Sequence, residues 1–142
     1  MKVVAGADHA GYELKDVLVK LLREQGHEVE DLGTNAAASV DYPDFAHGVA
    51  TAILEGRAER GLLVCGTGVG MAIAANRHNG IRAVNPSDVF TAKMSRNHND
   101  ANVLALGARV VGHGLATEIV NAWLAAPYEG GRHAKRVAKI EG

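Results

Sequence analysis

The fold of this chain is decided by the stretch Leu62-Leu63-Val64-Cys65-Gly66-Thr67-Gly68-Val69-Gly70. An apolar run leads into a turn with three alternating glycines, and an alanine-rich segment, Met71 to Asn76, follows. This order predicts a buried strand, a tight turn and a helix. Glycines let the backbone approach a ligand closely, and N–H groups at a helix N-terminus attract anions and favour a thiolate at Cys65. The stretch therefore predicts an anion site beside a reactive thiol, although a buried structural cysteine in a tight connection has the same pattern.

The known glycine motifs do not match this turn. A P-loop would need Gly-Lys-Ser/Thr, and a dinucleotide fingerprint would place its third glycine one residue after Gly70. Asn85, at the end of the next expected strand, is not the acidic residue that would hold a ribose. A cysteine phosphatase would carry an arginine where this chain has Met71. Nucleotide binding and phosphatase chemistry are therefore disfavoured.

Length and composition narrow the class of protein. The chain has 142 residues, 47% hydrophobic and 22% charged, which predicts one domain over residues 1–142 with a single core. A net charge of -1 and few aromatic side chains argue against a nucleic-acid partner. One cysteine excludes an intrachain disulfide and suits a reducing compartment. We find no apolar run long enough for a signal peptide or a membrane span, so we expect a cytoplasmic protein without a membrane partner.

Strand and helix patterns alternate along the chain. The predicted strands cover residues 2–5, 28–32, 61–64, 80–84 and 102–106. The predicted helices cover residues 12–25, 43–55, 71–76, a segment capped by Ser87 that runs to about 96, 113–125, and a basic C-terminal tail at about 130–142. Strict alternation requires parallel crossovers. The pattern predicts an α/β fold, a single three-layer αβα domain with a five-stranded parallel, Rossmann-like sheet.

Two polar turns fall at the carboxyl edge of this sheet, where such folds bind ligands. Asp8-His9 follows the first strand and the glycine turn follows the third. Asp8 and His9 are candidates for a site, although Asp commonly caps backbone N–H groups in turns. Arg132 and Arg136 lie four residues apart on one expected helix face. They form either a phosphate clamp or a solvated basic tail.

The segment His98-Asn99-Asp100 presents a geometrical problem. It follows a helix and precedes the fifth strand, so it should lie at the amino edge of the sheet, away from Cys65. A strand of five or six residues spans roughly 17–20 Å. These groups therefore have a structural role, or a second subunit brings them to the thiol and makes the protein an obligate dimer with a shared site.

Seven segments together resemble one family of enzymes. They are Asp8-His9-Ala10-Gly11, Asp41-Tyr42-Pro43, Cys65-Gly66-Thr67-Gly68-Val69-Gly70, Ile73-Ala74-Ala75-Asn76, Ser95-Arg96-Asn97-His98-Asn99-Asp100, Gly107-Ala108-Arg109 and Tyr128-Glu129-Gly130-Gly131-Arg132-His133. The set is similar to the sugar-phosphate isomerases, the family that includes ribose-5-phosphate isomerase B and the allose- and galactose-6-phosphate isomerases. Any single segment is weak, but the set is specific and spans nearly the whole chain in order.

The resemblance implies interconversion of ribose 5-phosphate and ribulose 5-phosphate in the pentose phosphate pathway, without metal or organic cofactor. It implies a homodimer with sites at the interface. A dimer of dimers is the alternative assembly. By this similarity Cys65 is the base that moves the proton, His98 opens the furanose ring, and Asp8 and Thr67 assist. The backbone of Gly66, Thr67, Gly68, Val69 and Gly70 would stabilise the enediolate. The residues implied to bind phosphate or sugar are His9, Tyr42, Asn99, Arg109, Arg132 and Arg136.

Some relatives have Gly at the position of Cys65 and Glu at the position of Met71, so that a carboxylate transfers the proton. Met71 cannot ionise, so Cys65 is the base that the resemblance implies here. The substrate stays open between ribose 5-phosphate, a six-carbon sugar phosphate and a free aldose. A sugar-phosphate binding module without catalysis is the alternative from another class. A thiol-dependent hydrolase is disfavoured, because the sequence places no histidine beside Cys65 within the subunit and lacks the phosphatase arginine.

Overall fold

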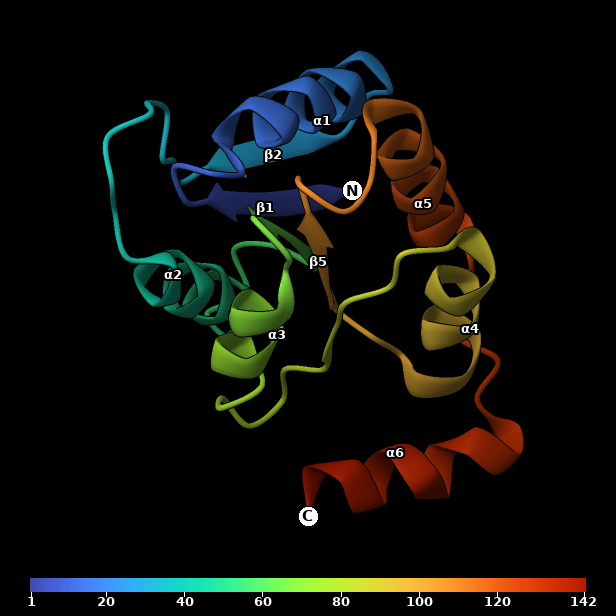
Figure 1. Ribbon diagram of the computed structural model, residues 1–142. Coiled ribbons are helices and arrows are strands. Elements are labelled where there is room, and N and C mark those ends of the chain that lie inside the picture. Colours follow the sequence, from blue (N-terminus) through green and yellow to red (C-terminus); the bar gives the residue numbers. More distant parts are fainter.

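The computed structural model describes residues 1–142, and its centre is one five-stranded sheet (Figure 1). All strand pairs are parallel, in the order β2-β1-β3-β5-β4. The strands are β1 Lys2–Ala7, β2 Glu28–Asp31, β3 Arg60–Cys65, β4 Ala83–Val84 and β5 Val103–Gly107. This arrangement confirms the predicted α/β class and the five parallel strands.

Helices cover both faces of the sheet (Figure 1). The helices of the sandwich are α1 Tyr12–Glu24, α2 Tyr42–Leu54, α3 Val69–Ala75, α4 Val89–Asn99 and α5 His113–Ala125. Leu62 and Val64 of β3 pack into one core with α1, α4 and α5, whereas Leu63 and Cys65 pack into the other with α2 and α3. Both faces of β3 are thus buried, as expected for a continuous apolar strand in a parallel sheet.

The strand order creates a switch point between β1 and β3. The chain leaves β1 through α1 towards β2 on one side, and the later strands are all added on the other side of β1. In open parallel sheets the crevice outside the carboxyl ends of two such strands is the usual ligand site. Asp8 follows β1 and Cys65 ends β3, so both turns singled out in the sequence flank this crevice.

Two local predictions need correction. The strand expected over residues 80–84 is only Ala83–Val84, because Gly80 has φ +90° and the N–H of Ile81 donates to the His78 carbonyl in a turn. The helix expected to begin at Ser87 is capped by Asp88, whose carboxylate accepts the Thr91 N–H at 2.6 Å. Aspartate is as good a cap as serine, and here the residue after Ser87 accepts one of the free N–H groups of the first turn.

The C-terminal tail forms a short 3-10 turn, η1 Gly131–His133, and a helix, α6 Ala134–Glu141. Helix α6 lies apart from the sheet at the bottom of Figure 1, and none of its residues is buried. The basic helical tail predicted for residues 130–142 is therefore present, although Arg132 belongs to η1 and only Arg136 to α6. No helix of the chain combines the length and the apolar character needed to cross a bilayer.

Candidate active site

The glycine turn places a thiol against a backbone donor. Cys65 is the last residue of β3 and is 6% exposed, and its Sγ accepts the N–H of Gly68 at 3.0 Å. Gly68 has φ +83° and precedes α3, so the turn delivers its N–H groups at the start of a helix. A donor at this distance stabilises negative charge on sulfur. The turn therefore places the sulfur of Cys65 and the backbone donors side by side.

Three glycines allow the neighbouring backbones to meet at this edge. A Cβ on Gly11 would lie 2.2 Å from the carbonyl oxygen of Val64, and one on Gly107 would lie 2.6 Å from that of Thr67. A Cβ on Gly68 would lie 2.3 Å from Nδ2 of Asn85, which donates to the Thr67 carbonyl at 3.2 Å. Side chains at these positions would push the turns after β1, β3 and β5 apart.

Asp8 is buried, and its side chain holds the turn that leads into α1. One carboxylate oxygen, Oδ1, accepts the N–H groups of Ala10 at 2.9 Å and Gly11 at 3.1 Å. Asp8 therefore has the turn-stabilising role that its position predicts. This role uses only one of its two carboxylate oxygens. His9 accepts the Val40 N–H on Nδ1 at 3.2 Å, so its Nε2 carries the proton when the ring is neutral and can donate to a ligand.

Tyr42 and Arg109 flank the same turn. A Cβ on Gly70 would lie 2.3 Å from Cε1 of Tyr42, so the phenol ring rests on the first turn of α3. Arg109 follows β5, and its guanidinium lies beside Gly66, where a Cβ would be 3.5 Å from Nη1. The N–H of Arg109 also donates to the Gly66 carbonyl at 3.0 Å. The carboxyl edge thus brings together Asp8, His9, Tyr42, Arg109 and the segment 65–70.

The remaining predicted site residues lie elsewhere. His98 and Asn99 end α4, just before β5 begins at Val103. Cys65 pairs with Gly107 at the other end of β5, and four strand residues separate these levels by about 13 Å. Cys65 also lines none of the cavities of the single chain. One chain therefore does not bring the thiol and His98 together.

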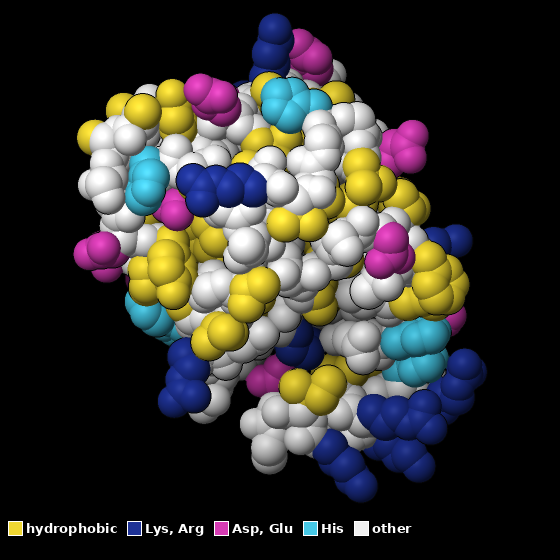
Figure 2. Space-filling view, viewed as in Figure 1, with side chains coloured by type: hydrophobic (Ala, Val, Ile, Leu, Met, Phe, Trp, Pro, Cys, Tyr) yellow, Lys and Arg dark blue, Asp and Glu magenta, His cyan; other side chains and the backbone are white.

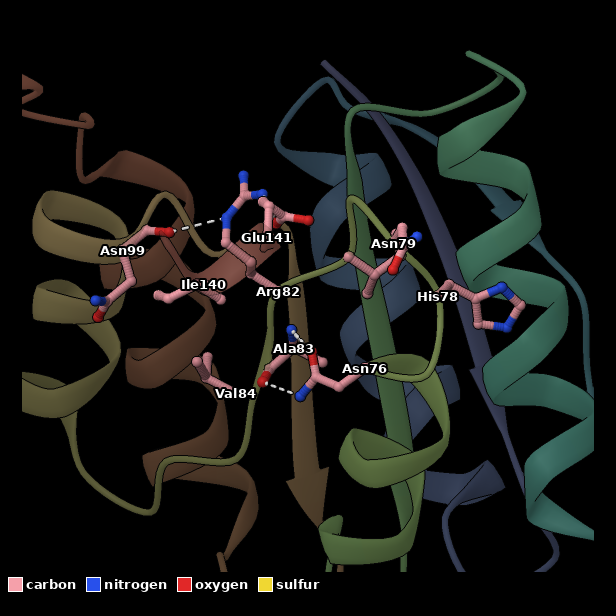
Figure 3. A pocket seen from close by; sticks show the side chains of 10 residues that line it. Asn76, His78, Asn79, Arg82, Ala83, Val84, Asn99, Ile140 and Glu141 are labelled. Carbon is pink, nitrogen blue, oxygen red and sulfur yellow. Dashed lines mark hydrogen bonds and ion pairs between the residues drawn. The ribbon is translucent and has the colours of Figure 1, made fainter. Parts of the chain in front are cut away.

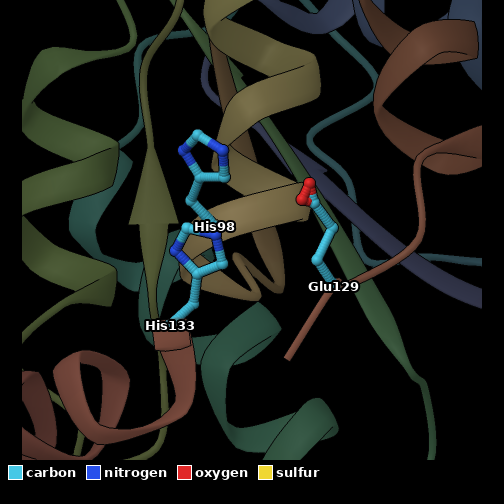
Figure 4. A group of neighbouring side chains, drawn as sticks. All are labelled: His98, Glu129 and His133. Carbon is cyan, nitrogen blue, oxygen red and sulfur yellow. The ribbon is translucent and has the colours of Figure 1, made fainter. Parts of the chain in front are cut away.

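His98 instead stacks on a residue that the sequence analysis did not single out. The rings of His98 and His133 have centroids 4.3 Å apart and planes inclined by 14° (Figure 4). His133 is 6% exposed and its Nε2 has no hydrogen-bond partner. Desolvation, followed by the charge of Arg132, lowers the pKa of His133 from 6.5. The sequence signal for His133 was its place directly after Arg132, in one of the seven segments that resemble the family.

Glu129 completes a group of three possible metal ligands with the stacked rings. The ligating atoms of His98, Glu129 and His133 all lie within 4.8 Å of one another (Figure 4). A metal binds an imidazole in the plane of the ring, so two nearly parallel stacked rings cannot both ligate one ion unless one of them rotates. The observed geometry is that of a ring pair.

Arg132 and Arg136 are exposed close to this ring pair. The tail carries Lys or Arg at positions 132, 135, 136 and 139, and a dense group of basic side chains gathers at the lower right of Figure 2, over the place that α6 occupies in Figure 1. The net charge of the chain is -1, so this positive surface is local. It is suited to an anionic ligand.

An α/β sandwich with a glycine turn, a thiol and converging polar groups at its ligand edge defines a small-molecule enzyme. The family model described as Ribose/Galactose Isomerase matches residues 3–140. The chain belongs to this family, and it is an aldose–ketose isomerase. The resemblance found in the sequence is thereby confirmed.

Individual relatives are similar over almost their full length. The chain is 53% identical to ribose-5-phosphate isomerase B of Escherichia coli, over 98% of this chain and 93% of that protein. It is 45% identical to D-erythrulose-4-phosphate isomerase of Pectobacterium atrosepticum, over 99% and 93%. The structure of ribose-5-phosphate isomerase B from Clostridium thermocellum superimposes with a TM-score of 0.98 at 53% identity, covering 99% of this chain and 95% of that one.

Proposed function

We propose that this isomerase interconverts ribose 5-phosphate and ribulose 5-phosphate and that Cys65 transfers the proton. The observation that carries the proposal is the 3.0 Å contact between the Cys65 sulfur and the Gly68 N–H in the glycine turn. Similar proteins named ribose-5-phosphate isomerase B support the substrate. Met71 is fully buried and apolar, which leaves Cys65 as the ionisable side chain of the turn.

In the proposed reaction, the thiolate of Cys65 takes the proton from carbon 2 of the open-chain aldose. The electron pair of that C–H bond forms the double bond between carbons 1 and 2, and the carbonyl electrons move to the oxygen on carbon 1. The N–H groups of segment 66–70 stabilise this enediolate, and one preorganised donor of this kind is worth about 3–4 kcal/mol. The thiol returns the proton to carbon 1, the carbon 2 hydroxyl loses its proton, the carbon 1 oxygen gains one, and the ketose results.

Other side chains serve ring opening and binding in this proposal. His98 donates a proton to the ring oxygen, while Asp8 and Thr67 help to move protons between the hydroxyls. Tyr42 borders the sugar and Asn99 holds it near the reacting carbons. The phosphate is bound by the Nε2–H of His9 and by the three guanidinium groups of Arg109, Arg132 and Arg136.

We further propose a homodimer in which one subunit supplies Cys65 and its partner supplies His98. This arrangement would resolve the separation of about 13 Å along the sheet, since a two-fold axis can bring the amino edge of one sheet to the carboxyl edge of another. Exposed apolar side chains on the helices near the turn support it: Val69 is 52%, Ile73 62% and Phe90 72% exposed. Covering these side chains would remove apolar surface from water.

Two other kinds of sugar phosphate are alternatives to ribose 5-phosphate as the substrate. The family description includes galactose, and one relative with 45% identity is named for D-erythrulose 4-phosphate. The proton transfer would be the same for four-, five- and six-carbon sugar phosphates, since only the length beyond the reacting carbons differs. The depth of the completed pocket would then determine the preference.

The test measures turnover of the purified protein on ribose 5-phosphate, allose 6-phosphate and erythrulose 4-phosphate with a chelator present. We expect preferential, chelator-insensitive conversion of ribose 5-phosphate. Cys65→Ala should lose at least about a thousandfold in kcat and still bind the sugar phosphate. Retained turnover would remove Cys65 as the base, and preferential turnover of another of these sugar phosphates would overturn the proposed substrate.

A further inference from the structure

Helix α6 is held to the rest of the chain mainly at its two ends. It has eight residues, none of them buried, and isolated helices of this length are marginal in water. At its start, η1 is anchored by the stack of His133 on His98. Gly130 precedes η1 and Gly131 begins it, with φ +64° and +55°, and a Cβ on either glycine would meet nothing within 4 Å. The helix therefore needs a second anchor to keep its direction.

Glu141 provides this anchor at the other end of α6. Its Oε1 accepts a hydrogen bond from Nη1 of Arg82 at 2.6 Å, and its Oε2 accepts one from the N–H of Gly80 at 2.8 Å. Both oxygens are engaged by the segment between α3 and β4, beside a cavity of about 290 Å³ that Arg82, Ile140 and Glu141 line (Figure 3). Hydrogen bonding to Arg82 lowers the pKa of Glu141. The two side chains are 16% and 30% exposed, so solvent screens the pair only in part.

Arg82 simultaneously binds the end of α4. Its Nε donates to the carbonyl of Asn99 at 3.0 Å (Figure 3), and its Nη2 donates to the carbonyl of Asp100 at 2.9 Å. These are the free carbonyls at a helix C-terminus, where a cation is favoured. One guanidinium thus joins the residues that directly follow His98 to the last turn of α6.

We infer that Arg82 and Glu141 are positioning residues, which fix Arg136 and Arg132 relative to His98 and Asn99. The inference rests on the proposed function, in which these four side chains meet one sugar phosphate. Arg136 lies five residues before Glu141, or about 7.5 Å along the helix. Without the clasp only the His133 stack holds α6, so the helix is free to swing about that single anchor and the two guanidinium groups lose their fixed spacing. Neither clasp residue needs to touch the substrate.

The first experiment compares KM and kcat for ribose 5-phosphate in Glu141→Gln and Glu141→Ala. Glutamine keeps an acceptor for Gly80 and loses the ion pair, whereas alanine loses both. We expect KM to rise about threefold in the first and about tenfold in the second, with kcat within about twofold of wild type, because phosphate binding is weakened and the thiol is untouched. Glu118→Gln on the exposed face of α5 removes the same charge at a side chain that makes no hydrogen bond or ion pair, and it should leave both constants unchanged.

A second readout does not depend on activity. Lys135, Arg136 and Lys139 are trypsin sites within α6, and cleavage there requires local opening of the helix. We expect tryptic release of the tail to be several-fold faster in Glu141→Ala than in wild type or Glu118→Gln, under conditions where the rest of the chain stays intact.

The outcomes separate the two ideas. A wild type that turns over ribose 5-phosphate, together with an unchanged KM in Glu141→Ala, would overturn the positioning role and leave the proposed function intact. Equal trypsin rates in the two proteins would overturn the clasp itself. A wild type without turnover would reject the proposed function, and the trypsin comparison would then decide alone whether the clasp holds the tail.

Discussion

The ring of Tyr42 occupies the space that a side chain on Gly70 would need, since a Cβ there would lie 2.3 Å from Cε1 and 2.7 Å from the hydroxyl oxygen. Tyr42 begins α2 and Gly70 is the second residue of α3, so this contact connects two helices beside the thiol. Tyr42 is 40% exposed and can swing outward when it is displaced.

Gly70→Ala should therefore move Tyr42 and leave the fold stable. We expect KM for ribose 5-phosphate to rise about threefold to tenfold, because Tyr42 borders the proposed sugar site. The matched control is Gly114→Ala, which is also the second residue of a helix and faces open space. The control should gain up to about 1 kcal/mol of unfolding free energy and keep its KM. Equal KM values in the two variants would remove Tyr42 from the binding site.

A shared site predicts complementation between two inactive variants. Cys65→Ala and His98→Asn should each be nearly inactive as homodimers. After they are unfolded together and refolded as an equal mixture, half of the dimers should be mixed, and each mixed dimer should carry one intact site. We expect about a quarter of wild-type turnover. A chain that carries both substitutions, mixed with either single variant, is the control. No recovery in a mixture shown to contain mixed dimers would place both residues of a site in one subunit.

Gly11 predicts a large difference in stability between two helix caps. A Cβ on Gly11 would lie 2.2 Å from the Val64 carbonyl oxygen and 2.9 Å from the Cys65 backbone nitrogen, so Gly11→Ala should cost at least about 2 kcal/mol of unfolding free energy. Gly112 caps α5 in open space, and Gly112→Ala should cost less than about 1 kcal/mol. Urea unfolding measures both. Similar losses in the two variants would contradict the close approach of α1 to β3.

The buried ring of His133 predicts a pH dependence of stability. Its pKa is lowered from 6.5 in the folded state, chiefly by desolvation and then by Arg132. Below pH 6.5 the unfolded chain therefore binds a proton more readily than the folded chain, and stability falls until the folded pKa is passed. We expect the loss of unfolding free energy between pH 7.5 and about 5.5 to be smaller in His133→Gln than in wild type.

The control for this measurement is His113→Gln, because His113 is exposed at the start of α5. This variant should retain the wild-type pH dependence. An identical pH dependence in wild type and His133→Gln would show that His133 does not titrate differently in the folded and unfolded chains.

The alternation of apolar strands and amphipathic helices was sufficient to predict the fold class. Because the side-chain pattern reports burial and not the neighbour of each strand, the position of β5 between β3 and β4 could not be predicted. The length of β4 could not be predicted for the same reason. The strand has only two residues because the N–H of Ile81 donates to the His78 carbonyl in a turn and the N–H of Arg82 donates to the Asn102 side chain.

Asp8, His9 and the segment 65–70 were predictable because the carboxyl ends of parallel strands share one edge of the sheet, whereas Tyr42 and Arg109 came from the family resemblance. Contacts over long distances in the sequence were not predictable from local pattern. The stack of His133 on His98 and the ion pair between Arg82 and Glu141 join segments that only the folded tail brings together. The roles of Cys65 and the arginines in catalysis and binding stay predictions.

The place of β5 beside β3 also has a consequence during synthesis. The ribosome completes β1, β2 and β3 well before Val103 to Gly107 emerge. Until then the edge of β3 that carries Leu62 to Val64 has no neighbour, and the wall that Gly107 forms against Thr67 is missing. An unpaired apolar edge is a site for association with other chains. We expect the growing polypeptide to pass through a stage in which the unpaired edge of β3, next to Cys65, is prone to associate with other chains.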